Sequence, residues 1–147
     1  MTLNDLVILL VEDNANDVIL IRRALQEAKV LNPLQVVKDG EQAIAYLKGE
    51  GKYADRAKYP LPVLLLLDLK LPRVSGFDVL EWLRKQKKLA RIPVVVLTSS
   101  NQSQDVNRAY DLGANSYLVK PVEFDDLVKL LKTLGLYWII LNEKPEP

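Results

Sequence analysis

Residues 63–68 read VLLLLD, so that five consecutive apolar side chains lead directly to the carboxylate of Asp68. Leucine also forms helices, but Pro60 and Pro62 stand before the run and Pro72 after it, and proline interrupts a helix. Apolar runs without alternation are typical of strands that are buried on both faces of a parallel sheet. We therefore predict a buried strand that ends at a carboxylate.

The same arrangement, a short apolar run followed by a longer helical pattern, repeats along the chain. The other predicted strands cover residues 6–11, 34–37, 93–97 and 116–119. The predicted helices cover residues 40–47, 75–86, 103–112 and 123–134, after a first helix that Asn14 or Asn16 caps and that continues to about residue 28. Strands that alternate with helices indicate an α/β domain, a doubly wound parallel sheet with helices on both faces.

Composition excludes several classes of protein. With 147 residues, the chain has the length of one domain and can bury a hydrophobic core large enough to fold without disulfide cross-links. It has neither cysteine nor histidine, which excludes disulfides, thiolate metal sites, histidine-based triads and a role as histidine kinase or phosphohistidine carrier. A net charge of +1 indicates no nucleic-acid partner. Because no signal peptide is recognisable and every apolar run is far shorter than the ~20 residues of a membrane span, we expect a cytoplasmic protein without membrane contact.

Polar side chains follow four of the predicted strands, at the sheet edge where open parallel sheets carry their function. They are Glu12 and Asp13 after the first strand, Asp68 after the third, Thr98 after the fourth and Lys120 after the fifth. Clustered carboxylates raise one another's pKa unless a cation joins them, and oxygen ligands favour a hard ion such as Mg²⁺. A lysine and a hydroxyl can bind phosphoryl oxygens. Single charges often decorate strand ends, but these residues together indicate a site.

Five short motifs resemble the receiver domain of two-component response regulators. They are VEDN at 11–14, LDLKLP at 67–72, Gly76, LTS at 97–99 and YLVKP at 117–121, in the family's order over residues 5–134. The resemblance implies the flavodoxin-like receiver fold, a five-stranded parallel sheet with strand order 2-1-3-4-5. We therefore expect a receiver domain over residues 1–134 and a C-terminal extension over 135–147, and the 13 residues of this extension are too few for an output domain. The protein is then a phosphorylation switch that signals through protein contacts and is not an enzyme.

The resemblance also implies how the acceptor site works. Asp68 accepts a phosphoryl group from a phosphohistidine of a sensor histidine kinase, in a reaction that needs Mg²⁺. Asp13, Asp68 and the backbone carbonyl of Lys70 bind the metal, and Glu12 acts through a metal-bound water. Lys70 replaces the smaller neutral side chains common at this position in the family, so its ammonium could shield the phosphoryl group.

By the same resemblance, further residues bind the phosphoryl group and report its presence. Lys120 pairs with the acceptor carboxylate before transfer and with the acyl phosphate afterwards, while Thr98 and Ser99 also bind the phosphoryl group. Thr98 and Tyr117 form the switch, in which the aromatic ring moves inward as the threonine moves. The peptide bond between Lys120 and Pro121 is expected to be cis, an isomer found essentially only before proline.

Two segments do not fit the repeated pattern. The connection over residues 49–62 is long, and residues 136–141 read LYWIIL, an apolar stretch too short for a membrane. This stretch either folds over its own domain or packs against a second copy, and we favour an isologous homodimer through the fourth helix, fifth strand, fifth helix and tail. Both segments together resemble single-domain regulators paired with cyanobacterial phytochrome kinases, which implies a phytochrome-type sensor histidine kinase as partner. The downstream protein stays unidentified.

Three alternatives remain open from the sequence. A pseudo-receiver would share the fold without taking a phosphoryl group, and the complete set of site residues argues against it. A flavodoxin-like FMN carrier would need a hydroxyl- and glycine-rich loop after the first strand, where the chain has EDNA at 12–15. A phosphatase that uses an aspartyl phosphate would need a second carboxylate two residues after the nucleophile, where Lys70 stands.

Overall fold

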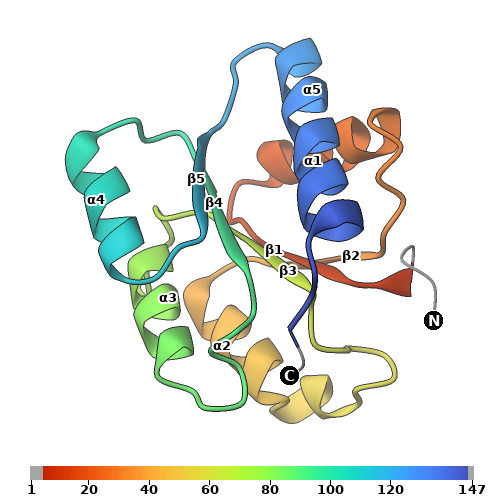
Figure 1. Ribbon diagram of the computed structural model, residues 1–147. Helices are drawn as coiled ribbons and strands as arrows, with labels where there is room; N and C mark the ends of the chain where they lie inside the picture. The colour runs from red at the N-terminus through yellow and green to blue at the C-terminus, as the bar shows by residue number, and fades with distance from the viewer. Residues whose placement is uncertain (1–4, 146–147) are drawn as a thin grey trace.

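The computed structural model describes residues 5–145, and Figure 1 shows a sheet of five parallel strands between two layers of helices. From one edge of the sheet to the other, the strands are β2 (Leu34–Val37), β1 (Ile8–Val11), β3 (Leu64–Leu67), β4 (Val94–Thr98) and β5 (Ser116–Val119). The predicted doubly wound fold and the strand order 2-1-3-4-5 are confirmed. Since the order reverses beside β1, the crevice between the carboxyl ends of β1 and β3 is where a site is expected.

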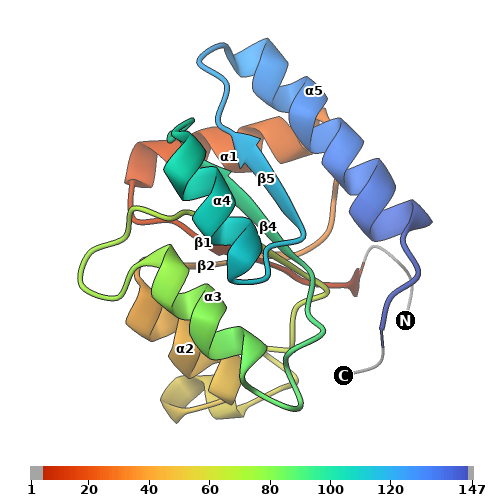
Figure 2. The same ribbon diagram turned by 60° about the vertical axis from the view of Figure 1, so that its left-hand side comes forward.

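The helices divide into two layers. One layer consists of α1 (Ala15–Glu27) and α5 (Phe124–Leu134), and the other of α2 (Gly40–Lys48), α3 (Gly76–Arg84) and α4 (Ser103–Asp111), as Figures 1 and 2 show. A short 3-10 helix, η2 (Gly51–Ala54), follows α2, and a π-helical segment, η3 (Gly135–Leu141), continues α5. Over residues 5–145, the structure contains no helix with the length and apolar character needed to cross a membrane.

Strand β3 belongs to two hydrophobic cores at once. Its side chains are fully buried, and they face the two helix layers alternately. Leu65 and Leu67 pack in the core under α2 and α3, whereas Leu64 and Leu66 pack in the core under α1 and α5. This double burial explains the continuous apolar run. Because the register pairs Val11 with Leu67, the residues that follow β1 and β3 emerge side by side at the same edge.

Local signals fix where two helices near this edge begin. Asn14, one of the two predicted caps, accepts a backbone N–H of the first turn of α1 at 3.0 Å. Ser75 and Asp78 form a capping box at the start of α3. The same helix begins directly against the loop after β3, since a Cβ added at Gly76 would lie 2.1 Å from the carbonyl oxygen of Asp68. Glycine is therefore required for α3 to start at this distance from Asp68.

The long connection over residues 49–62 is folded onto the end of α2. The Tyr53 ring packs against Tyr46 and Tyr59, with ring centroids 5.1 and 5.0 Å apart. Arg56 donates to the carbonyl oxygens of Tyr46 and Leu47 at 2.7 and 2.8 Å. These carbonyls lie in the last turn of α2, where no further helical turn supplies N–H donors, so the loop closes the helix instead of extending into solvent.

The tail, residues 135–141 of η3, packs one side against its own domain and leaves the other side exposed. Ile139 is 3% exposed and belongs to the core under α1 and α5. In the same segment Leu136, Tyr137, Ile140 and Leu141 remain 51% to 62% exposed. The segment thus folds in part over its own surface, and a second copy as the partner of the exposed side stays a prediction.

Candidate functional site

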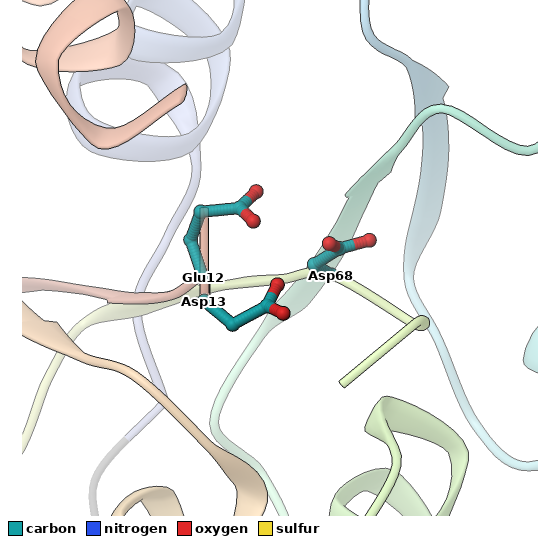
Figure 3. Close-up of side chains that lie close together, drawn as sticks. All are labelled: Glu12, Asp13 and Asp68. Carbon is teal, nitrogen blue, oxygen red and sulfur yellow. The ribbon is translucent and has the colours of Figure 1, made fainter. Parts of the chain in front are cut away.

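Three carboxylates lie together where β1 and β3 end. Figure 3 shows Glu12 and Asp13, from the end of β1, beside Asp68 at the end of β3. One carboxylate oxygen from each residue lies within 4.8 Å of the others. Glu12 and Asp68 are only 1% and 7% exposed, whereas Asp13 is exposed. The strand register therefore gathers negative charge at one point, part of it shielded from water.

Backbone N–H groups orient the two buried carboxylates. The N–H of Asn14 donates to Glu12 Oε2 at 3.1 Å, and the N–H of Leu69 donates to Asp68 Oδ1 at 2.8 Å. The N–H of Lys70 lies 3.5 Å from the same Asp68 oxygen. These hydrogen bonds fix the direction in which both carboxylates face the cluster.

Lys120, which follows β5, supplies positive charge to this group. Its Nζ donates to the carboxylates of Glu12 and Asp17, the latter at 2.8 Å, and lies 3.7 Å from Asp68 Oδ2. The contact with Asp68 is therefore present but is the longest of the three. Asp17 is a site residue that the sequence analysis missed, because an acid in the first turn of a helix is also explained by the helix dipole.

Burial and neighbouring charges shift the pKa of both a buried acid and its lysine. Burial is the main cause that raises the pKa of Glu12 to about 7; the charge of Asp68 adds to it, and the hydrogen bond from Lys120 opposes it. Burial lowers the pKa of Lys120, but the hydrogen bonds to Asp17 and Glu12 outweigh burial and raise it overall. Lys120 thus stays protonated while Glu12 titrates near neutral pH. Negative charge in excess of one lysine favours a bound cation.

The predicted switch residues lie at or near the carboxyl ends of β4 and β5. Thr98, the last residue of β4, is fully buried, and Ser99 beside it is exposed. Tyr117 in β5 is half-buried, and its hydroxyl donates to the carbonyl oxygen of Ser100 at 2.9 Å. The structure therefore joins the aromatic ring to the loop directly after Thr98, and inward movement of the ring stays a prediction.

The expectation of a cis bond before Pro121 is wrong for this structure, because residues 5–145 contain no cis peptide bond. The trans isomer of a bond before proline is the more stable one by about 0.5–1 kcal/mol. Just before this bond, the Lys120 N–H donates to the Thr98 carbonyl oxygen at 2.8 Å. The lysine reaches the carboxylates from this trans backbone.

Lys70 has a partner that the sequence analysis did not identify. Its Nζ lies 3.3 Å from Oδ2 of Asp105, which belongs to the first turn of α4. The same Asp105 oxygen accepts a hydrogen bond from the Ser100 hydroxyl at 2.5 Å. The Ser100 bond first, and the Lys70 contact after it, hold the pKa of the Asp105 carboxyl below its usual range. Lys70 is thus paired across the site and does not stand free above it.

The donor atoms fit a hard divalent cation. Every side-chain donor of the three-acid group is an oxygen, and oxygens this close together can share one ion. The predicted backbone ligand, the carbonyl of Lys70, follows in the loop directly after Asp68. The chain therefore has an acidic metal-binding cluster at the carboxyl edge of its sheet.

Fold and site together define the class of the protein. The chain matches the response regulator receiver domain family over residues 8–132, and it belongs to that family. It is 40% identical over 144 residues to the probable methanogenesis regulatory protein FilR2 of Methanothrix harundinacea, a match that covers 96% of this chain and 88% of FilR2. The predicted family is confirmed.

Phytochrome-associated response regulators are among the similar proteins. Response regulator Rcp1 of Synechocystis is 39% identical over 133 residues, which is 90% of this chain and 88% of Rcp1. A structure of Rcp1 with bound Mn²⁺ has a TM-score of 0.83 at 38% identity and covers 95% of this chain and 98% of Rcp1. The phosphorylated cyanobacterial phytochrome response regulator RcpA has a TM-score of 0.89 at 38% identity, covering 97% of this chain and 99% of RcpA. The predicted resemblance to phytochrome-paired regulators is confirmed.

Proposed function

We propose that this chain is a phosphorylation switch in which Asp68 accepts a phosphoryl group from a sensor histidine kinase. The observation that carries the proposal is a buried carboxylate at Asp68 with Asp13 and Glu12 beside it and a protonated Lys120 3.7 Å away. RcpA, which is similar over nearly the whole chain, has been solved in a phosphorylated form. A pseudo-receiver is the alternative function, and the complete set of site residues argues against it.

Transfer moves one phosphoryl group between two side chains. An oxygen of Asp68 attacks phosphorus in line with the N–P bond of phosphohistidine. The new O–P bond forms as the N–P bond breaks, and the electron pair returns to the imidazole, which takes a proton from water. Negative charge grows meanwhile on the equatorial phosphoryl oxygens. The Lys120 ammonium and the Thr98 hydroxyl, with Ser99 beside them, stabilise that charge by donating hydrogen bonds.

The acidic cluster suits Mg²⁺ as the ion for this reaction. Asp13, Asp68 and the backbone carbonyl of Lys70 would hold it, with Glu12 contributing through a bound water. The ion supplies positive charge to the phosphoryl oxygens. Rcp1, solved with Mn²⁺, supports a divalent cation at this site.

The partners follow from the relatives and from one exposed surface. RcpA is a phytochrome response regulator, which supports a phytochrome-type histidine kinase as the phosphoryl donor. We propose a receiver domain over residues 1–134 whose extension, 135–147, adds to a homodimer interface formed by α4, β5 and α5. The exposed side chains of Leu136, Tyr137, Ile140 and Leu141 support this interface. The signal then leaves the domain through protein contact.

Intact-mass spectrometry after incubation with acetyl phosphate tests the acceptor. We expect one phosphoryl adduct that requires Mg²⁺ and is absent from Asp68→Asn. Asp111→Asn, an exposed acid at the end of α4, is the matched control and should keep the adduct. Absence of an adduct in the wild type, together with no NMR shift on beryllofluoride titration, would favour the pseudo-receiver.

Sedimentation tests the dimer. Ile140→Glu and Leu141→Glu place charges on side chains that are 58% and 62% exposed, so the fold should tolerate them while a dimer should dissociate. These substitutions are preferable to truncation after residue 134, which would also remove the buried Ile139. Ile19→Glu, at a 54% exposed position in α1 and outside the proposed interface, is the control. A dimer that survives both tail variants would remove the tail from the interface.

A further inference from the structure

A chain of side-chain contacts crosses the mouth of the site. Lys70, in the loop after Asp68, contacts Asp105 in the first turn of α4 at 3.3 Å. Asp105 accepts the hydroxyl of Ser100 at 2.5 Å, and the Ser100 carbonyl oxygen accepts the hydroxyl of Tyr117 at 2.9 Å. The loop that carries the acceptor is thereby tied to α4 and, through the loop after β4, to β5.

The two residues of the Lys70–Asp105 pair differ in exposure and in the number of their partners. The Lys70 side chain is 64% exposed, whereas the Asp105 side chain is 18% exposed and held by Ser100 as well. Lysine carries a compact charge on a flexible stem with donors that can turn to a new acceptor. Its backbone N–H lies 3.5 Å from Asp68 Oδ1, so the stem starts at the acceptor itself. Lys70 is therefore the end that can change partners.

We propose that Lys70 exchanges partners when Asp68 becomes phosphorylated, leaving Asp105 for the phosphoryl oxygens and releasing the first turn of α4. The inference rests on the proposed function and adds a second route from the acceptor to α4. An aspartyl phosphate offers several anionic oxygens in place of one carboxylate, and charge-assisted bonds to it are short and strong. An exposed ion pair is weak enough to be given up. After Lys70 has left, Asp105 keeps only the hydrogen bond from the Ser100 hydroxyl.

Titration with beryllofluoride in the presence of Mg²⁺, followed by NMR, tests the exchange. Lys70→Met loses the ligand, so the mimic should bind about three- to ten-fold more weakly. Asp105→Asn frees Lys70 before the mimic binds, so binding should tighten about two- to five-fold. If the pair were only structural, both variants would break the same contact and shift the affinity in the same direction, which would overturn the proposal.

A double variant separates partner exchange from simple loss of charge. In the Lys70→Met background, Asp105→Asn should change the affinity by less than about 1.5-fold, because no lysine remains to be freed. An undiminished effect of Asp105→Asn in that background would also overturn the proposal. Lys85→Met, which breaks the exposed 3.4 Å pair with Glu81, is the control and should leave the affinity unchanged.

Amide hydrogen exchange in the first turn of α4 gives a second readout. The N–H groups of Asp105 and Val106, which donate to the Gln102 carbonyl oxygen, should exchange faster in both single variants than in the wild type. The mimic should raise wild-type exchange to the level of the variants and change the variants little. Wild type that does not bind the mimic would refute the proposed function as well. If the wild type binds the mimic but amide hydrogen exchange in α4 does not change, the result would refute the change of partner by Lys70 and leave the proposed function standing.

Discussion

The two ends of the sheet each hold a partly buried cation, and the groups around the two cations differ. At the amino end, Arg84 donates to the carbonyl oxygens of Gly113, Ala90 and Ile92 and to Asn115 Oδ1, at 2.7 to 2.9 Å. At the carboxyl end, Lys120 faces three carboxylates. Every N–H of the Arg84 guanidinium has a neutral oxygen as its acceptor. Lys120, in contrast, faces more negative charge than one ammonium can neutralise.

This contrast separates a structural end of the sheet from the end that carries the acidic metal-binding cluster. Carbonyl dipoles satisfy all sides of a guanidinium and leave nothing for another ligand, so Arg84 ties the end of α3 to the starts of β4 and β5. Excess carboxylate charge around Lys120 favours a bound cation. Substitutions at either end should therefore change different properties of the protein.

Arg84→Met should have the largest effect on stability. It removes the donors of several carbonyl oxygens at once, and we expect the free energy of unfolding to fall by about 3 kcal/mol. Urea unfolding measures it, and Arg91→Met, at an exposed position nearby, is the control. Folded Arg84→Met protein should still form the Asp68 adduct. A loss below about 1 kcal/mol would contradict a structural role for the arginine.

The acidic cluster should make the metal-free protein less stable as pH rises. Because the pKa of Glu12 is raised to about 7 in the folded state, from 4.5, the folded protein binds more protons than the unfolded chain between these values. Protonated Glu12 therefore contributes stability at low pH, and this contribution is lost as pH rises through 7. We expect the free energy of unfolding to fall by about 2 kcal/mol between pH 5 and pH 8. Urea unfolding in the presence of a chelator measures it. Glu12→Gln should flatten this dependence, and an unchanged slope would contradict it.

Mg²⁺ should offset the same excess charge. At a concentration about ten-fold above its dissociation constant, the ion should add about 1.4 kcal/mol to the free energy of unfolding at pH 8. A chelator should remove the gain. Asp13→Asn should abolish it, and Asp111→Asn, far from the cluster in sequence, should not. An equal gain in both variants would mean that the ion binds elsewhere.

Asp17→Asn should have the smallest effect on stability, below about 1 kcal/mol, since the acid is partly exposed. Its hydrogen bond is the first of the causes that raise the pKa of Lys120, so that pKa should fall. NMR titration of the lysine ammonium signals measures the change. Asp125→Asn, exposed in the first turn of α5, should leave it in place.

The fold could be predicted because the strands are recognisable from the sequence alone. Leu64 to Leu67 must be buried on both sides, and the polar residues directly after the strands mark the carboxyl edge. The boundaries are less well determined: the helix predicted over residues 75–86 ends at Arg84, because the chain turns there toward β4. Propensity and periodicity do not fix the last turn of a helix.

Contacts between distant segments could not be predicted in the same way. Asp17, Asp105 and Arg84 each look like an ordinary charged residue on a helix, and only the packing of the elements brings them to their partners. The bond before Pro121 shows the opposite limit, since the family pattern suggested cis where the backbone is trans. The residues at the strand ends identify the site from sequence, and tertiary geometry decides which charges meet there.

Strand β3 also carries a consequence for how this domain can diverge between relatives. Its even-numbered leucines, Leu64 and Leu66, touch one helix layer, and its odd-numbered ones, Leu65 and Leu67, touch the other. A substitution in one core therefore calls for compensation in that layer only. The α1–α5 layer and the α2–α4 layer can therefore change in sequence independently, while the shared strand holds Asp68 in the same position between them.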